Sequence, residues 1–423
     1  MEKIFKQIVD IMQNDYAGWK DKRGCDRPEH FLELIKGNDQ LSNKEFKEIV
    51  EEYLLDFNDR HIHFIMENAD NEQPKDRGFK VRRYEDRLYV TEVDSEERLE
   101  PGMSIVSLGG KSILELKELY QRRLNENHPE RENWAPILML YPEGEVVGAN
   151  GKQKFTFGLY DKKPYVPTYS VEKRQDTVFI TMTDFANPDA IAKMVVDNKE
   201  FLETTEKWII DVRVNYGGSD ASIYPLLPYL MPEEGMELAG SDDDKMLINC
   251  TEASAVRVLP ELEEMLSGTD DEHARHVLTV FKNEWERNRG KGFVEFDFGD
   301  MVSDTFVKGM KYPSSIIVLT DVYCGSSGDS FVELVKKSNK VTVIGRATMG
   351  LNDYANLVSM NWEEGFELMY PSSRLTRIDK GQGMTGVGIT PHIHIPWTPE
   401  HIEKDVDVEK ALDLLSRSSV EVN

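Results

Sequence analysis

Cysteine and long apolar runs are both scarce in this sequence. Its 423 residues include only three cysteines, at positions 25, 250 and 324, which are too few and too scattered for a disulfide framework. No apolar run approaches the roughly 20 residues that cross a bilayer. The first twenty residues also lack the apolar centre and small-residue cleavage site of a signal peptide. We therefore expect a cytoplasmic protein without a membrane partner.

Positive charge is in deficit as well. Lys and Arg number 51 against 77 Asp and Glu, so the formal net charge is −26. A charge of this sign repels phosphate backbones and anionic lipid surfaces, which argues against nucleic acid as a partner. With 39% hydrophobic and 30% charged residues the chain can still bury a large core, and its length corresponds to two or three domains.

The spacing of apolar residues changes along the first half of the chain. In residues 2–57 apolar side chains recur three and four residues apart, as in KEFKEIVEEYLLDF, which predicts an N-terminal helical cap over residues 1–70. Between 75 and 165 the period is two, with a turn signal at Gly109-Gly110 and one helix at 113–124. This stretch is predicted to be a small β-rich module.

Strands alternate with helices from about residue 170 onward. Apolar segments such as KWIIDVRV, SSIIVLTD and KVTVIGR are separated by helical ones, which indicates βαβ crossovers and a mostly parallel sheet. A highly charged stretch at about 251–300, helical at 270–289, interrupts this pattern and is interpreted as an insertion. The sequence therefore predicts an α/β core over residues 170–423.

Gly217 and Gly218 directly follow one of the predicted core strands. Glycines at the carboxyl end of a parallel strand let backbone N–H groups approach a ligand closely, so the pair is a candidate cradle for an oxyanion or a phosphate. The alternative is an ordinary turn from strand to helix.

The segment TDVYCGSSGDSF lies between another predicted strand and a helix. Small residues there permit a sharp turn that lifts one side chain above the sheet, as in a nucleophile elbow. Ser326 is the best-placed nucleophile, and the N–H of Ser327 is the matching oxyanion donor. The alternative is a helix N-cap made of Ser and Asp. Cys324 is either a second candidate nucleophile or a small buried residue.

Two His-x-His pairs offer a base for such a nucleophile. His61 and His63 lie on one face if their segment is extended, and His392 and His394 form the second pair. A metal site is the alternative, because His is the commonest metal ligand. No HExxH motif accompanies either pair.

Taken in order, these segments resemble the core of the S41 serine peptidases, which include the tail-specific or C-terminal processing proteases and the tricorn core. The resemblance covers about 170–250 and 300–415, and it is carried by WIIDVRVNYGGS, IIVLTDVYCGSSGDSFVELV, VIGRATMG, GVGITPHIHI and the closing VDVEKAL helix. It extends more weakly to D-x-H-x-x-F at 59–64 and to 75–165, which looks like the family's PDZ-like domain. It implies a ClpP/crotonase-like mixed sheet, a peptide or protein substrate, and no metal or cofactor. A homo-oligomer is compatible with it.

The resemblance also assigns roles to individual residues. The family's nucleophile falls on Ser326, and its oxyanion donors fall on the amides of Ser327 and of Gly217 or Gly218. Leu351 follows Gly350 where the bacterial processing proteases carry the lysine of a Ser/Lys dyad. The chain is therefore more similar to the tricorn branch, whose base is a histidine, and His61 matches that position.

The residues behind this base depart from the tricorn pattern. Thr385 stands where that branch carries a Glu, and Arg60 stands where it carries a relay serine. The acid that orients His61 therefore has to be found elsewhere. Asp353 is the first candidate, because it follows the segment that approaches the nucleophile in relatives, and Asp59 is the second.

Three functions are compatible with the sequence. The first is an intracellular serine peptidase that uses Ser326 as nucleophile and His61 as general base. The second is a catalytically degenerate S41-like protein that binds peptides through its PDZ-like module. The third is a metal-dependent hydrolase.

Overall fold

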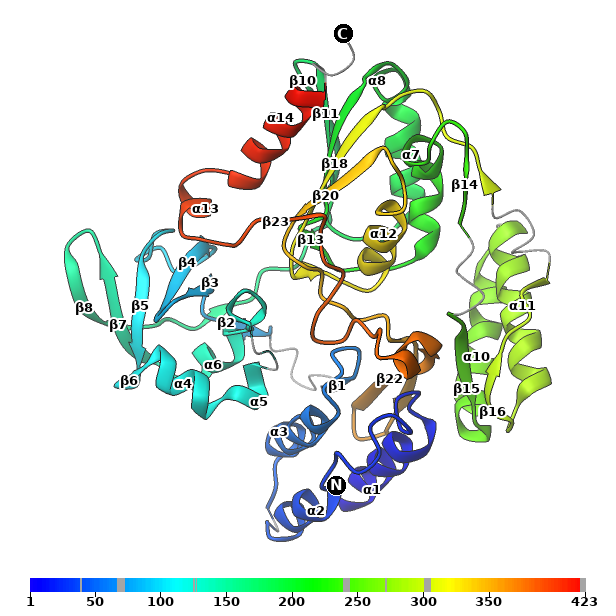
Figure 1. Cartoon of the computed structure of the whole chain (residues 1–423). Helices are drawn as coiled ribbons and strands as arrows, with labels where there is room; N and C mark the ends of the chain where they lie inside the picture. Colours follow the sequence, from blue (N-terminus) through cyan, green and yellow to red (C-terminus); the bar gives the residue numbers. More distant parts are fainter. Residues whose placement is uncertain are drawn as a thin grey trace. The chain divides into compact units, whose positions relative to one another are not determined.

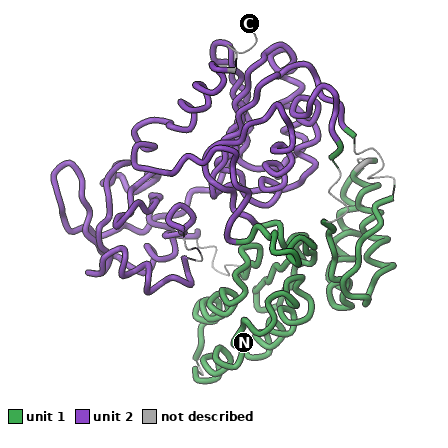
Figure 2. The backbone as a smooth tube through the Cα atoms, viewed as in Figure 1, with its two compact units in different colours: residues 1–71, 237–306, 351–385 green, residues 72–236, 307–350, 386–423 purple. Residues whose placement is uncertain are grey.

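The structure, a computed structural model, describes residues 1–38, 40–66, 73–124, 126, 128–238, 244–270, 272–299 and 306–418. The chain divides into two compact units, drawn in green and purple in Figure 2. The first unit comprises residues 1–71, 237–306 and 351–385, and the second comprises 72–236, 307–350 and 386–423. This division differs from the three consecutive domains that the sequence suggests, because the N-terminal cap and the charged insertion belong to the same unit.

The first unit is built on an antiparallel sheet whose strands come from three distant parts of the chain. The strand order is β1 (His63–Met66), β22 (Phe366–Leu375), β15 (Met246–Cys250) and β16 (Gly292–Glu295), and β21 (Tyr354–Asn361) also pairs with β22. Met66 lies opposite Phe366 in this sheet. Pairing over such a separation leaves no local sequence pattern, which is why these strands were not predicted.

Amphipathic helices cover this sheet. They are α1 (Glu2–Asp10), α2 (Pro28–Lys36) and α3 (Asn43–Leu54), with a π-helical turn at Ile11–Asp15 after α1. Helices thus form in the first part of the predicted cap at 1–70, whereas residues 63–66 form the strand β1. Phe46 of α3 packs its ring 5.1 Å from that of Phe366. The charged insertion forms two helices, α10 (Glu252–Gly268) and α11 (Glu272–Asn288), of which the sequence predicts only the second.

The second unit contains the predicted parallel sheet. Its strand order is β10 (Tyr169–Arg174), β11 (Thr177–Met182), β12 (Lys207–Asp211), β18 (Ser315–Thr320), β20 (Val341–Gly345) and β23 (Ile393–His394). β10 runs antiparallel to β11, and all later neighbours are parallel. The mixed α/β core expected from the alternation of strands and helices is therefore present.

Helices cover both faces of this sheet. Figure 1 shows α14 (Val406–Ser418) on one side and α7 (Pro188–Asp197) and α12 (Ser327–Val335) on the other. Ala411 and Leu415 of α14 pack on Ile209 and Ile317 of the sheet. α8 (Lys199–Thr204) and α9 (Leu227–Leu230) complete the crossovers. No helix in the described parts of the chain is long and apolar enough to span a membrane.

The β-rich module is part of the second unit. Its sheet contains β3 (Phe79–Tyr84), β4 (Arg87–Val93), β5 (Ser104–Leu108), β7 (Glu143–Gly148) and β8 (Gly151–Thr156) in this order, with β6 (Lys111–Ser112) paired to β5. The helix predicted at 113–124 is present as α4 (Ile113–Leu119) and α5 (Gln121–Leu124), and α6 (Ala135–Leu140) follows. Leu88, Ile105 and Trp134 lie in a separate core of this module.

Candidate active site

Ser326 lies on the tight turn between β18 and α12. Its φ of +58° and ψ of −122° are in a region that residues with a side chain rarely adopt. An ordinary N-cap serine is extended, so a capping role alone does not explain this backbone. The conformation costs about 1–3 kcal/mol and is typical of a nucleophile elbow, where it exposes the side chain at the end of a sheet.

Asp329 ties the backbone of this turn to that of the segment after β20. One of its carboxylate oxygens accepts the N–H of Ser326 at 2.9 Å, and the other accepts the N–H of Gly350 at 2.9 Å. The carboxylate is fully buried, so both hydrogen bonds are shielded from water. The N-cap interpretation is therefore also correct, since Asp329 returns a hydrogen bond to the N-cap residue of α12.

Gly217 touches the elbow directly. A Cβ atom built on Gly217 would lie 2.6 Å from the Cβ of Ser326 and 2.8 Å from the carbonyl oxygen of Gly325. The φ of Gly217 is +75°, which also favours glycine. Its N–H donates to Asn215 Oδ1 at 3.0 Å, so this amide already has an acceptor. Asn215 was not predicted as a site residue, although an asparagine shortly before two glycines could have indicated a side chain that binds the turn.

Gly218 and Ser327 join the two turns. Ser327 Oγ donates to the carbonyl oxygen of Gly218 at 2.8 Å. A Cβ on Gly218 would lie 2.3 Å from the carbonyl carbon of Phe185, so a side chain is excluded there too. Gly218 is exposed. Among the described residues, the Gly217 amide donates a hydrogen bond, whereas the amides of Gly218 and Ser327 donate none. The structure thus brings four of the predicted site residues together: Ser326, Ser327, Gly217 and Gly218.

Gly217→Ala is expected to lower the free energy of unfolding by about 2–4 kcal/mol, because it adds a steric clash to an unfavourable φ. Gly110→Ala is the matched control, since Gly110 has a φ of +79° but no atom within 4 Å of its Cβ position. The control should lose only about 1 kcal/mol. Urea unfolding of both variants measures the difference, and equal losses would show that Gly217 is not packed against Ser326.

Cys324 does not have the surroundings of a nucleophile. Its side chain is fully buried, and this burial raises the pKa of the thiol well above its ordinary value. A thiol of this kind stays protonated at neutral pH and reacts poorly. Cys324 is therefore the small buried residue that was the alternative interpretation.

His61 lies in the first unit, in a turn before β1. The imidazole is buried, and its Nδ1 lies 2.6 Å from the carbonyl oxygen of Tyr354. A carbonyl can only accept, so Nδ1 carries the proton and Nε2 keeps a lone pair. His63 is exposed at the start of β1, whereas His61 lies in the preceding turn, so the two histidines do not share one face as they would in an extended segment.

The two candidate orienting acids have other partners. Asp353 is buried, and its carboxylate accepts hydrogen bonds from the amide of Met384 and from the amide and hydroxyl of Thr385, at 2.7–2.9 Å. Asp59 accepts the N–H of His61 at 2.9 Å rather than a ring proton. The ring N–H of His61 is accepted instead by the backbone carbonyl of Tyr354. A backbone acceptor cannot be recognised from the residue types in a sequence.

The second His-x-His pair is also engaged elsewhere. His392 Nδ1 accepts the N–H of Val343 at 3.0 Å, and burial lowers the pKa of His392. His394 Nε2 lies 3.1 Å from a carboxylate oxygen of Glu130. Over the described stretches of the chain, no three His, Cys, Asp or Glu side chains are grouped as metal ligands.

A buried ionic network begins at the carboxyl end of β18. Asp321 pairs with Arg82 of β3 at 2.6 Å and with Arg346 at 2.7 Å, and Arg346 also pairs with Asp407 of α14 at 2.7 Å. All four residues are buried. Burial alone would raise the pKa of Asp321, but the charges of Arg82 and Arg346 outweigh it and hold this pKa below its ordinary value.

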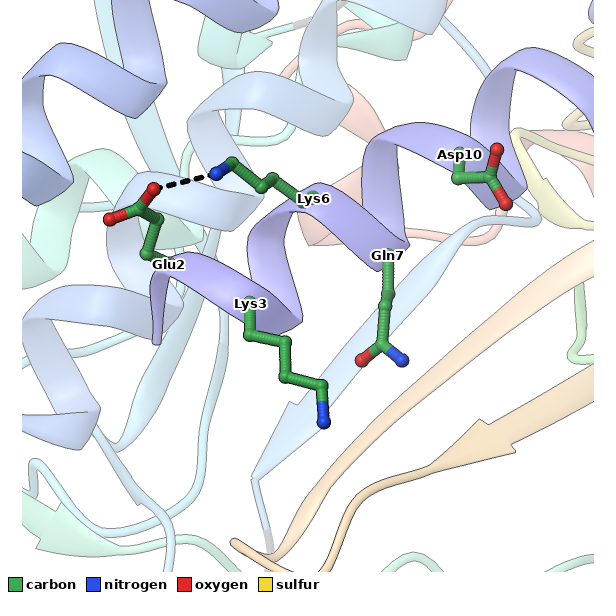
Figure 3. Close-up of a pocket in the computed structure, with 5 residues that line it drawn as sticks. All are labelled: Glu2, Lys3, Lys6, Gln7 and Asp10. Carbon is green, nitrogen blue, oxygen red and sulfur yellow. Dashed lines mark hydrogen bonds and ion pairs between the residues drawn. The ribbon is translucent and has the colours of Figure 1, made fainter.

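One pocket lies along α1 in the first unit (Figure 3). Its volume is about 590 Å³, and it is lined by Glu2, Lys3, Lys6, Gln7 and Asp10. Lys6 and Glu2 form an ion pair of 2.7 Å within it. These five side chains all belong to one helix and include none of the predicted site residues, so we assign the pocket no catalytic role.

A strained serine at a strand-to-helix turn, beside a buried glycine and an exposed one, is the arrangement found in hydrolases that act through a nucleophilic serine. The family model of peptidase family S41 matches residues 176–395, which is 220 of the 423 residues. The chain therefore belongs to peptidase family S41, a family of serine peptidases. This confirms the resemblance drawn from the sequence.

Individual relatives are distant. Mature CPAF has a similar structure, with a TM-score of 0.64 and 13% identity over 97% of this chain and 95% of that chain. Mature CPAF complexed with lactacystin gives a TM-score of 0.63 and 13% identity over 98% and 97% of the two chains. At this identity the likeness concerns the fold.

A protein of Chlamydia trachomatis whose name is given only as "Protein" is 23% identical over 253 residues. The match covers 56% of this chain and 41% of that protein, so this chain spans less than half of the relative's length.

Proposed function

We propose that this protein is a serine peptidase that hydrolyses peptide bonds with Ser326 as its nucleophile. The observation that carries the proposal is the backbone of Ser326, whose φ of +58° is maintained by the buried carboxylate of Asp329. Strain of this kind persists only where the surrounding structure enforces it, and it concentrates at active sites. Membership of peptidase family S41 supports the same reaction class.

In the proposed mechanism, Ser326 Oγ attacks the scissile carbonyl and its proton passes to His61. The His61 tautomer supports this role, because Nε2 holds the lone pair that accepts the proton. The imidazolium then protonates the leaving amine, and water releases the acyl group by the same steps. His61 belongs to the other unit, so its pairing with Ser326 rests on the sequence resemblance and on this tautomer.

The proposed oxyanion donors are the amides of Gly218 and Ser327. The Gly217 amide is a weaker candidate than the sequence suggested, because it donates to Asn215. Gly218 is held in position by the Ser327 hydroxyl and by backbone hydrogen bonds on both sides of it to Phe185. Preorganised amides of this kind stabilise the tetrahedral intermediate without moving during the reaction.

Two further features of the proposal concern partners and location. The β-rich module at 75–165 is proposed to act as a PDZ-like peptide-binding domain. The three thiols form no disulfide, which fits a reducing compartment such as the cytoplasm.

Asp353 is proposed to support the base indirectly, because it fixes Met384 and Thr385 next to the strand that begins with Tyr354.

Covalent labelling separates a working peptidase from a degenerate peptide-binding protein. A fluorophosphonate probe reacts only with an activated serine, so we expect stoichiometric labelling of the wild-type chain at Ser326 and none in Ser326→Ala. Mass spectrometry of the labelled peptide identifies the site. The control is Ser416→Ala, which removes an exposed serine of α14 and should label fully. Absence of labelling in the folded wild-type chain would favour the binding protein instead.

A further inference from the structure

Three tyrosines of the second unit, on or in contact with the segments that form the elbow, are not used by the mechanism above. Tyr216 immediately precedes Gly217, and Tyr323 is three residues before Ser326. The two flanking segments pair as short parallel strands, β13 (Val214–Asn215) and β19 (Tyr323–Cys324). Tyr165, from the segment that follows the β-rich module, places its ring centroid 5.1 Å from that of Tyr216. Tyr216 and Tyr323 therefore belong to the two paired segments that lead to Gly217 and Ser326, and Tyr165 contacts Tyr216.

These three aromatic side chains are all exposed to solvent. Tyr216 is 52% exposed, Tyr165 is 50% exposed and Tyr323 is 38% exposed. A single exposed aromatic residue needs no explanation, but neighbouring ones beside a reactive group mark a binding surface. Hydration of these rings is unfavourable, so an apolar ligand that covers them gains free energy.

The surface is fixed before any ligand arrives. The Tyr165 hydroxyl donates to Thr183 Oγ1 at 2.7 Å, and the Tyr216 amide donates to the carbonyl oxygen of Thr183 at 3.0 Å. Tyr165 and Tyr216 are thus both held by Thr183, and their rings meet edge to face, at 81°. A rigid pair of rings offers contact area at a low entropic cost.

The nearby charges favour a neutral ligand group. Lys80 of β3 is paired with Glu92 at 2.6 Å, and Arg82, whose guanidinium lies 5.4 Å from the Tyr323 ring centre, is paired with Asp321. Burial raises the pKa of Tyr165 to about 12, so its phenol is uncharged at neutral pH. Both cations already have a carboxylate partner, so the rings are the main feature of the surface.

We propose that Tyr165, Tyr216 and Tyr323 form a subsite that binds an apolar or aromatic side chain of the peptide substrate next to the scissile bond. The inference rests on the proposed peptidase function and extends it to a substrate class. The occupant is a peptide because the surface is continuous with the elbow: Gly217, the next residue after Tyr216, lies against Ser326. An extended peptide whose carbonyl reaches Ser326 passes over this surface.

The test measures binding in a chain that cannot hydrolyse its ligand. Ser326→Ala is titrated with fluorescein-labelled decapeptides of an Ala-Ser background in which one central residue is Phe, Leu or Gly. The uniform background leaves each peptide free to place its central residue in the subsite. We expect the Phe peptide to bind about tenfold more tightly than the Gly peptide by fluorescence anisotropy, with Leu between them.

Second substitutions in the Ser326→Ala background assign this preference to the rings. Tyr216→Ala is expected to reduce it to less than about threefold, whereas Tyr216→Phe keeps it, because the ring rather than the hydroxyl makes the contact. Phe201→Ala is the matched control. Phe201 is 41% exposed on α8, which precedes the amino end of β12, whereas Tyr216 follows the carboxyl end of that strand. This control should keep the full preference.

The outcomes separate the subsite from the peptidase proposal. Equal binding of the Phe and Gly peptides, no binding of either, or a preference that survives Tyr216→Ala would overturn the subsite. Hydrolysis of these peptides by the wild-type chain without any aromatic preference would also overturn it, while leaving the peptidase proposal intact. A preference that depends on Tyr216 in a chain that hydrolyses no peptide would support the subsite and contradict the peptidase.

Discussion

Ser326→Ala is expected to lower kcat for peptide hydrolysis by about four to six orders of magnitude, because no other group in the site can form the acyl intermediate. Ser327 follows directly, but its hydroxyl donates to the carbonyl oxygen of Gly218. Cys324, the other neighbouring nucleophile, is fully buried. Initial rates with a quenched-fluorescent peptide pool, followed over hours for the variant, cover this range.

The same assay tests the base. Members of a catalytic unit act together, so His61→Ala should lose nearly as much activity as Ser326→Ala, and the double variant should lose little more. Full activity in Ser326→Ala would refute the nucleophile. Full activity in His61→Ala would leave Ser326 in place and require another proton acceptor.

Ser326→Gly provides a stability control for this experiment. Glycine adopts the φ of +58° without strain, so this variant should unfold at a temperature equal to or above that of Ser326→Ala, although both lack the hydroxyl. Thermal unfolding of the two inactive variants therefore shows whether the elbow is strained in solution.

Asp321→Ala is expected to destabilise the protein by about 3–5 kcal/mol, which is the second large effect we predict. The substitution leaves Arg82 and Arg346 buried without one of their carboxylates. Breaking a buried pair in this way costs more than deleting a surface pair, since the remaining charge has lost its water. Urea unfolding of the second unit measures the loss.

Two comparisons make this prediction specific. Asp197→Ala removes the exposed pair with Lys193 on α7, and it should change stability by less than about 0.5 kcal/mol. A variant in which Asp321, Arg82 and Arg346 are all replaced by apolar residues should recover part of the lost stability, because no buried arginine then lacks its carboxylate. Asp407 loses Arg346 in this variant but keeps its ion pair with Arg213. A loss in Asp321→Ala no larger than that in Asp197→Ala would show that the network is solvated.

The network also makes stability depend on acid. The pKa of Asp407 is lowered to about 2, since hydrogen bonding to His401 and the charge of Arg346 outweigh the effect of burial, and the pKa of Asp321 is lowered as well. Both folded-state values lie below the unfolded value of about 3.9. Their stabilisation is therefore present above about pH 4 and is lost as the pH falls toward 2. Asp321→Ala should flatten this part of the stability profile.

The sequence predicts the second unit better than the first, for a physical reason. Residues 315–345 carry a strand, a turn of small residues, a helix and a strand, each with its own local periodicity, and all four elements are found there. The sheet of the first unit depends on pairs such as Met66 with Phe366, which no local pattern encodes. The family could be predicted from the sequence because most of its motifs lie in the second unit, whose strands and helices follow local patterns.

The site shows the same division between local and distant information. The residue types around Ser326 predict a sharp turn, and the structure places Gly217, Gly218 and Ser327 beside it. The partner of His61 could not be predicted, since it is a main-chain carbonyl whose position depends on β21. Asp353 was predicted as the orienting acid because it follows the segment that approaches the nucleophile in relatives, but its carboxylate accepts the amides of Met384 and Thr385.

The order of strands in the first unit has a consequence for biosynthesis. β1 is translated first, whereas its partner β22 is added only when residues 366–375 leave the ribosome. Until then the apolar faces of α1, α2 and α3 have no sheet to cover them. The nascent chain therefore exposes this apolar surface until late in its synthesis, which favours aggregation of incomplete chains, and the unit cannot function before β22 is made.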